Sequence, residues 1–158
     1  MKPTAYVVAV LILVGCSNQQ GKKQEIKNNG IEINYTLDGS GEQTLLFVHG
    51  WCINQKYWDS QVDFFVKDYQ VVTIDLPGHG NSGKQRDSWK VSDYASDVVK
   101  VIDELKLKHV VLIGHSMGGD IVLEAALARP DVVDAIIGVD NFKDVGVLPD
   151  EQTRQAIN

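Results

Sequence analysis

The most informative part of the sequence is Val110-Val111-Leu112-Ile113-Gly114-His115-Ser116-Met117-Gly118-Gly119. Its first four residues form a continuous apolar run, which is typical of a strand covered on both faces. The residues from Met117 to Ala128 have helical composition, and a helix there must stop before Pro130. Between them, two glycines flank a serine in the spacing G-x-S-x-G. The stretch therefore predicts a buried strand that turns tightly into a helix at Ser116.

Further strands are predicted on both sides of this turn. Residues 31–35 alternate between apolar and polar, which indicates a half-buried strand. The turn residues Asn28-Asn29-Gly30 precede it and allow a hairpin with residues 25–27. Continuous apolar or β-branched runs predict the remaining strands at 44–48, 71–74 and 133–139.

Helical segments separate these strands. Residues 57–66 are one such segment, and a second begins at Val91, where apolar residues recur with helical spacing and Ser92 is a plausible N-cap. Buried strands that alternate with helices predict an α/β fold: a mostly parallel sheet with flanking helices. With nothing paired beyond it, the strand at 133–139 is expected to be a bare edge.

Composition narrows the classes of function. The 158 residues, 17.5 kDa, suffice for one domain. There are 15 basic and 21 acidic residues, and this net charge of -6 argues against binding to nucleic-acid phosphates, which needs a basic face. Two cysteines, Cys16 and Cys52, exclude a disulfide framework or a Cys-rich zinc site. The sequence implies no metal and no organic cofactor.

The N-terminus has the pattern of a targeting segment. Lys2 is followed by an apolar run, residues 5–15, that is shorter than the ~20 residues needed to span a bilayer. The run ends in Leu13-Val14-Gly15-Cys16, which resembles a bacterial lipobox. We therefore expect a lipoprotein signal peptide at 1–15, lipidation of Cys16, a polar tether at 16–24 and a lipid anchor in the bacterial cell envelope, on the periplasmic or extracytoplasmic side. A plain secretory signal and an uncleaved anchor are the alternatives.

The G-x-S-x-G pattern between a strand and a helix is typical of a nucleophile elbow. A serine there sits in a strained backbone conformation with its hydroxyl projecting from the sheet, and side chains at Gly114 and Gly118 would collide with neighbouring backbone. The N-terminus of the following helix favours negative charge near Ser116. A merely structural turn is the alternative interpretation.

Three motifs, each placed after a predicted strand, carry a family resemblance. They are His49-Gly50-Trp51, the loop from Asp75 to Ser82, and Gly114 to Gly119. With them the chain resembles the α/β-hydrolase fold superfamily, in its cap-bearing branch of small esterases and related hydrolases, from Ile31 to the C-terminus. The resemblance implies a hydrolase that cleaves an ester or similar acyl bond in a small molecule and needs no cofactor.

The resemblance also implies roles for individual residues. Ser116 would be the nucleophile, and the backbone N–H groups of Met117 and Trp51 would hold the oxyanion. Gly50 would let the backbone approach closely, and Gly50, Trp51 and Met117 would line the substrate pocket. Asp75 would belong to a structural turn, because a catalytic acid is expected after the nucleophile in chain order.

The other polar candidates are expected to have structural roles. His49 and His79 would pack loops, His115 would be turned away from the nucleophile, and His109 would lie at the surface. Cys52 is interpreted as a small buried residue rather than a reactive thiol.

No histidine follows Ser116, so the catalytic base and the usual acid are expected outside this sequence. Asp140, after the strand at 133–139, is an alternative acid, or else a structural residue that closes the strand. The sequence thus reads as a C-terminally incomplete hydrolase: part of the core at 25–140 and the start of a cap at 141–158.

Several functions remain open at this point. A non-catalytic remnant or binding module is one alternative to an esterase. A carbon–carbon hydrolase, a peroxidase-like enzyme and an aminopeptidase relative are others, because relatives of these kinds in the superfamily are built on the same nucleophile elbow. Serine at position 116 argues against a haloalkane dehalogenase or an epoxide hydrolase, which in this superfamily use a carboxylate nucleophile.

Overall fold

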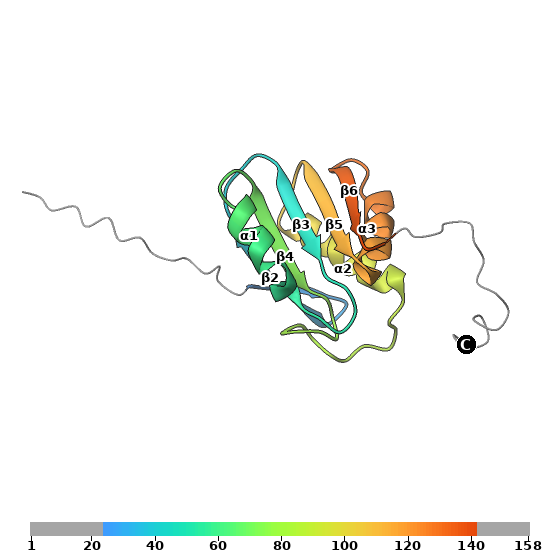
Figure 1. Cartoon of the computed structure of the whole chain (residues 1–158). Helices are drawn as coiled ribbons and strands as arrows, with labels where there is room; N and C mark the ends of the chain where they lie inside the picture. The colour runs from blue at the N-terminus through green and yellow to red at the C-terminus, as the bar shows by residue number, and fades with distance from the viewer. Residues whose placement is uncertain (1–23, 142–158) are drawn as a thin grey trace, which may run out of the picture.

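The computed structural model describes residues 24–141, which form a six-stranded sheet with helices on both faces (Figure 1). The predicted signal peptide, Cys16, nearly all of the tether and the predicted start of the cap lie outside the described residues, except that Asn141 is described. Within the described part of the chain, no helix has the length and apolar character needed to cross a membrane.

The sheet has the strand order β1-β2-β4-β3-β5-β6. The strands are β1 (Gln24–Asn28), β2 (Ile31–Asp38), β3 (Thr44–Val48), β4 (Gln70–Asp75), β5 (Val110–His115) and β6 (Val133–Val139). β1 and β2 pair antiparallel, as do β2 and β4, whereas β4, β3, β5 and β6 run parallel. The mostly parallel α/β fold predicted from the sequence is confirmed. The carboxyl ends of β3, β4, β5 and β6 consequently lie at one edge.

The hairpin of β1 and β2 forms through a two-residue turn. Asn28 pairs with Ile31, and the two residues between them, Asn29 and Gly30, have φ of 46° and 83°. Two successive positive φ angles are what a type I′ turn requires, and Asn-Gly is its preferred sequence. The predicted hairpin is therefore confirmed, with longer strands than the sequence pattern indicated.

The helices depart from the sequence expectation at two places. The predicted helix at 57–66 is a 3₁₀ turn, η1 (Gln55–Trp58), followed by a short α1 (Asp59–Phe65), and the Asn54 side chain accepts a hydrogen bond from the Lys56 N–H at 3.0 Å. Ser92 is not an N-cap: α2 (Val91–Glu104) begins before it, and the Asp93 carboxylate accepts a hydrogen bond from the Lys90 N–H at 2.8 Å. The third helix is α3 (Met117–Ala128).

Two apolar clusters hold the layers together. The larger one joins α2 and α3 to one face of the sheet, and the smaller one joins η1 and α1 to the other. The larger cluster buries, among others, Leu46, Ile74, Leu112, Ile102 and Ile121. Each such side chain contributes about 1.5–3 kcal/mol when removed from water.

The smaller cluster borders an open apolar groove of about 690 Å³ beside α1. Side chains of β3, β5 and β6 form its floor, and they include Phe47, Ile113 and Ile137. Ile137 is 49% exposed on β6, which is the outer strand of the described sheet. The bare edge expected at 133–139 is therefore present in the described residues.

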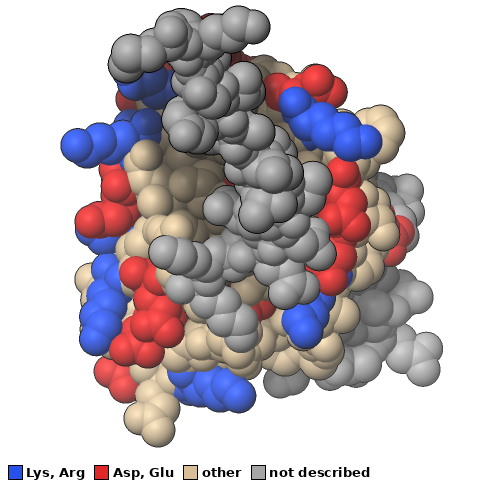
Figure 2. Space-filling view, turned by 90° about the vertical axis from the view of Figure 1, so that its left-hand side faces the viewer, with Lys and Arg blue, Asp and Glu red and all other residues tan. Residues whose placement is uncertain are grey.

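Charged side chains of both signs are interspersed over the face displayed in Figure 2. No basic patch dominates this view, in keeping with the chain's net charge of -6.

Candidate active site

The three sequence motifs meet at the carboxyl edge of the parallel strands. His49-Gly50-Trp51 follows β3, the loop after Asp75 follows β4, and Ser116 follows β5. Ligands of open α/β sheets bind outside this edge. The topology therefore gathers residues far apart in the sequence into one candidate site.

Ser116 lies at the junction of β5 and α3 with φ 51° and ψ -122°. This conformation is strained for a residue with a side chain, and surrounding structure must hold it. The Ser116 N–H donates to the Val139 carbonyl on β6 at 2.9 Å, and the Gly119 N–H donates to the Ser116 carbonyl at 2.8 Å. The Ser116 side chain makes no capping hydrogen bond to α3. The backbone is thus fixed while the hydroxyl is not used by the helix.

The two glycines of the pattern allow a close approach of backbone segments. A Cβ on Gly114 would overlap the carbonyl of Gly118, and a Cβ on Gly118 would lie 2.5 Å from the Val48 carbonyl oxygen and 2.8 Å from that of His49. The collisions expected from the sequence are therefore found. They show that the first turn of α3 rests directly on the end of β3.

The loop after β3 passes against Ser116. A Cβ on Gly50 would lie 3.1 Å from the Ser116 Cβ and 2.8 Å from Nδ1 of His115. Within residues 24–141, neither the Trp51 N–H nor the Met117 N–H donates a hydrogen bond. The Trp51 ring is 63% exposed, and Met117 is half-buried. The Gly50 backbone, which precedes the Trp51 peptide, therefore lies against Ser116.

The His49 side chain is buried beneath the loop that follows β3. It is fully buried; its Nε2 accepts a hydrogen bond from the Leu76 N–H at 2.9 Å, so Nδ1 carries the proton that is donated to the Gly50 carbonyl at 2.7 Å. Burial lowers the pKa of His49 below its ordinary value of 6.5, because the imidazolium would lose hydration. The predicted structural role of His49 agrees with these contacts.

His49 makes stability depend on pH. With a folded pKa below 6.5, its contribution is fully present above pH 6.5 and is lost as the pH falls toward the folded pKa, because the unfolded chain takes up the proton first. We expect the free energy of unfolding to decline over this window by up to about 1.4 kcal/mol per pH unit from this group. In His49→Gln, which keeps an acceptor for Leu76, the decline should be shallower; urea titrations at pH 7.5, 6.5 and 5.5 would measure it. An unchanged slope would contradict the assignment.

The remaining histidines also have packing contacts. The His79 ring meets His49 at 5.2 Å and Trp51 at 5.3 Å, between ring centroids. His115 stacks on Tyr57 at 4.7 Å, and its Nδ1 is buried without a hydrogen-bond partner among the described residues. His109 is exposed, and its Nδ1 lies 3.2 Å from Asp134. None of these contacts involves the Ser116 hydroxyl.

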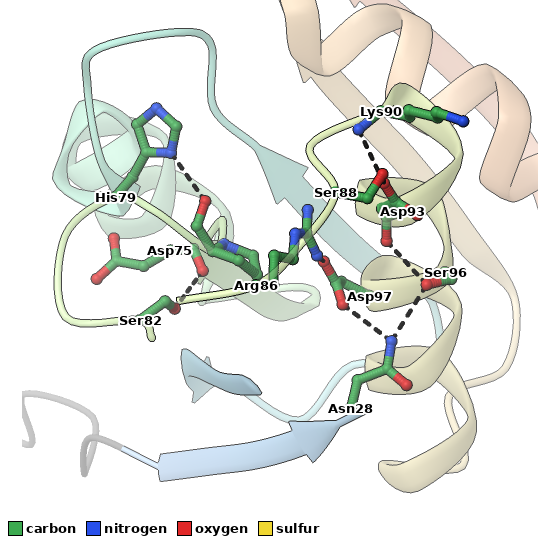
Figure 3. A network of polar contacts seen from close by, with 11 residues as sticks. Asn28, Asp75, His79, Ser82, Arg86, Ser88, Lys90, Asp93, Ser96 and Asp97 are labelled. Atoms are coloured by element: carbon green, nitrogen blue, oxygen red, sulfur yellow. Dashed lines mark hydrogen bonds and ion pairs between the residues drawn. The ribbon is translucent and has the colours of Figure 1, made fainter. Parts of the chain in front are cut away.

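Asp75 organises the turn after β4. Its carboxylate accepts hydrogen bonds from the N–H groups of Gln55 and Asn81, both at 2.8 Å, and its carbonyl accepts one from the Ser82 hydroxyl. Figure 3 shows Asp75 and Ser82 side by side under the loop that bears His79. Asp75 is 1% exposed, and these contacts agree with its interpretation as part of a structural turn.

A family model described as "alpha/beta hydrolase fold" matches residues 43–157. The chain belongs to the α/β-hydrolase fold family. Among curated relatives, a non-heme chloroperoxidase of Burkholderia pyrrocinia is 40% identical over 93 residues, which are 58% of this chain and 34% of that protein. The curated relatives of this chain include both hydrolases and haloperoxidases.

Two solved structures of the family are also similar. A bacterial membrane phospholipase A is 30% identical with a TM-score of 0.73, covering 82% of this chain and 41% of its own. The epoxide hydrolase CorEH is 25% identical with a TM-score of 0.73, covering 87% of this chain and 49% of its own. The chain spans 28% to 42% of the length of the first four curated relatives it matches.

Asp140, the alternative acid, lies beside the elbow of this family fold. It is exposed with φ 53° at the end of β6. The residues on either side of it contact the Ser116 backbone: Val139 accepts from the Ser116 N–H, and the Asn141 side chain donates to the Ser116 carbonyl. Its role as an acid stays a prediction.

The interpretation of Cys52 as a buried residue is wrong. The side chain is exposed and the backbone has φ 60°. Cys52 lies with Trp51 in an exposed turn after β3, and this turn leaves the thiol in solvent. Among the described residues, no cluster of His, Cys, Asp or Glu could hold a metal ion.

A buried ion pair between Arg86 and Asp97, which no sequence motif indicated, joins the loop after β4 to α2. Arg86 Nη1 lies 2.6 Å from Asp97 Oδ2, and the Asp97 side chain is 1% exposed. Burial raises the pKa of Asp97, while hydrogen bonds from Asn28 and Arg86 act in the opposite direction. A signal was present: Asp97 lies at helical spacing from Tyr94 and Val101, on the apolar face of α2, where a carboxylate needs a cation.

Proposed function

We propose that this chain is part of a serine hydrolase that cleaves an ester or similar acyl bond of a small molecule through an acyl-enzyme on Ser116. The Ser116 Oγ attacks the acyl carbon and loses its proton to a general base, and the leaving group departs with that proton. Water then attacks the acyl-enzyme and releases the acid. The conformation of Ser116 between β5 and α3 carries the proposal.

The proposal assigns the oxyanion to two backbone donors, Met117 N–H and Trp51 N–H. The close approach of Gly50 to Ser116 supports this assignment, because it brings the next peptide, that of Trp51, to the nucleophile. The N-terminus of α3 adds a positive partial charge there. Each aimed donor contributes about 2.7–4 kcal/mol to lowering the barrier.

The proposal places the catalytic base outside residues 1–158. His49 and His79 are engaged in loop packing, His115 stacks on Tyr57, and His109 faces Asp134. A histidine from another part of the whole protein would receive the Ser116 proton, and Asp140 or a further carboxylate would orient it. Gly50, Trp51 and Met117 would line the pocket for the acyl group.

The experiment is phosphonylation of the whole protein by a fluorophosphonate probe, followed by peptide mass spectrometry. An adduct on the peptide that contains Ser116, together with hydrolysis of a panel of p-nitrophenyl esters, is expected. A whole protein without such an adduct would be the non-catalytic remnant or binding module that the sequence left open.

A peroxidase-like activity is the second candidate, because the chain is 40% identical to the non-heme chloroperoxidase over their matched region. The two candidates separate in one assay: the purified whole protein is given an ester alone, or an ester with hydrogen peroxide, bromide and monochlorodimedone as the halogen acceptor. Halogenation of monochlorodimedone in the second mixture, without ester hydrolysis in the first, would favour the peroxidase-like activity over the hydrolase.

We further propose that the protein is lipid-anchored through Cys16 in the bacterial cell envelope. The apolar run that ends in Leu13-Val14-Gly15-Cys16 and the polar residues that follow support this anchor. Cys16→Ser should abolish incorporation of labelled palmitate, because the acceptor thiol is lost. Cys52→Ser is the matched control and should retain incorporation. Labelling that persists in Cys16→Ser would contradict the proposal.

A further inference from the structure

The loop between β4 and α2, residues 76–90, crosses the carboxyl edge of the sheet and contains no helix or strand. Backbone hydrogen bonds fix its first half. The Gly78 N–H donates to the Gly83 carbonyl within the loop at 2.8 Å, and the Gly83 N–H donates to the Glu32 carbonyl on β2 at 2.8 Å. The second half relies on side chains. Two of its residues bind α2: Arg86 pairs with Asp97, and the Ser88 hydroxyl donates to Asp93.

Arg86 joins three parts of the chain (Figure 3). Its Nη1 pairs with Asp97 on α2, and the other oxygen of Asp97 accepts a hydrogen bond from the Asn28 side chain on β1 at 2.9 Å. The Arg86 guanidinium lies over the Trp89 ring at 4.8 Å and over the Tyr94 ring at 4.4 Å. Its buried Nε and Nη2 have no hydrogen-bond partner among the described residues. The guanidinium is covered instead by the faces of the Trp89 and Tyr94 rings.

Trp89 connects Arg86 to the first half of the same loop. A Cβ on Gly78 would lie 2.9 Å from Cζ3 of Trp89, so the indole rests against the Gly78 backbone. Gly78 has φ 86° and directly precedes His79. The His79 ring in turn packs edge-on against Trp51. Contacts therefore run without a gap from Asp97, through Arg86 and Trp89, to the loop beside Ser116.

We propose that Arg86 is a positioning residue: its ion pair with Asp97 and its stacking on Trp89 hold His79 against Trp51 and so fix the peptide that donates to the oxyanion. This inference rests on the proposed function. It assigns no chemistry to Arg86, which reaches the site only through Trp89, Gly78 and His79.

The polar hollow beside Arg86, about 680 Å³ and lined by Asn28, Asp93 and Asp97 among others, could instead suggest a ligand site. Several of its polar groups are paired with one another: Asp93 accepts from the Ser88 hydroxyl at 2.6 Å, and Asp97 is held by Asn28 and Arg86. This internal pairing favours a structural role for the cluster.

The test compares Arg86→Gln, Trp89→Leu and the double variant in the whole protein. For Arg86→Gln and for Trp89→Leu we expect kcat for ester hydrolysis, normalised to the amount of titrated Ser116, to fall about tenfold. KM should stay within about twofold of the unaltered protein, because the Trp51 N–H stabilises the transition state more than the bound substrate. Because both residues act through one path, the double variant should lose no more than either single variant. Arg86→Lys keeps the charge beside Asp97 without the planar stack and should fall between Arg86→Gln and the unaltered protein.

Arg129→Gln is the matched control. Arg129 pairs with Asp131 at the far end of α3, and its loss should leave kcat unchanged. Normalisation to titrated Ser116 removes any effect of misfolding. If Arg86→Gln does not fold, Trp89→Leu tests the same path, because Trp89 is 44% exposed and its replacement leaves the buried ion pair intact. Unchanged kcat in a folded variant, or additive losses in the double variant, would overturn the inference.

A second readout separates this inference from the proposed function. Hydrogen–deuterium exchange of the peptide spanning residues 49–54 should accelerate in Arg86→Gln and not in Arg129→Gln, whether or not Ser116 reacts. Equal exchange rates overturn the positioning inference even in an active hydrolase. Faster exchange in a protein whose Ser116 is never phosphonylated supports the positioning and overturns the proposed function.

Discussion

Ser116→Ala should abolish phosphonylation and lower ester hydrolysis by the whole protein by roughly 10⁴-fold or more, because the substitution removes the attacking oxygen and leaves only the oxyanion donors. The fold should persist. The Ser116 backbone is held by Val139 and Gly119, and the lost hydroxyl makes no capping bond to α3. Initial rates, probe labelling and thermal melting measure the three quantities.

Ser92→Ala is the control for this experiment, since Ser92 is an exposed serine in the first turn of α2. It should label and turn over like the unaltered protein. Residual labelling of Ser116→Ala at the full rate would show that another residue is the nucleophile.

Gly118→Ala should lower the rate of Ser116 phosphonylation by about 100-fold, which is the scale of loss that a displacement of roughly 1 Å causes. The new methyl group would lie 2.5 Å from the Val48 carbonyl and 2.8 Å from that of His49. The end of β3 and the first turn of α3 must therefore separate, and Gly50 moves away from Ser116.

The same substitution should cost stability as well as reactivity. Overpacking destabilises by about 1–3 kcal/mol, and the better helix propensity of alanine returns about 1 kcal/mol of this. Chemical unfolding would give the net cost, and stopped-flow labelling would give the rate. Gly30→Asn is the control, because position 30 is open and asparagine tolerates its positive φ. A labelling rate in Gly118→Ala equal to that of Gly30→Asn would contradict the close contact of β3 with α3.

The sheet was predictable because its signals are local. Runs such as Leu45 to Val48 and Val110 to Ile113 are apolar on both faces, and Asn29-Gly30 specifies its own turn. The 3₁₀ turn at 55–58 was not predictable in this way. Its geometry depends on the Asn54 cap and on Trp58, which packs against Phe47 of β3, and the helical spacing of residues 57–66 contains neither contact.

The candidate site was likewise predictable only where its signals are local. The crowding around Gly114 and Gly118 follows from the pattern itself, since a tight strand-to-helix turn leaves no space for a Cβ. The exposure of Cys52 and the pairing of Arg86 with Asp97 depend on the paths of two irregular loops. No periodicity describes such paths, so the partners appear only once the chain is folded.

The strand order has a consequence for how the protein folds. The hairpin of β1 and β2 closes locally, but β3 completes its pairing only when Thr44 meets Gln70 on β4 and Val110 on β5. Pairings between distant segments close large loops at an entropic cost and slow the folding reaction. During synthesis, residues 24–38 can therefore adopt their hairpin early, whereas Gly50 cannot meet Ser116 before β5 has left the ribosome. Chaperone dependence would thus concentrate in the interval between the synthesis of β3 and that of β5.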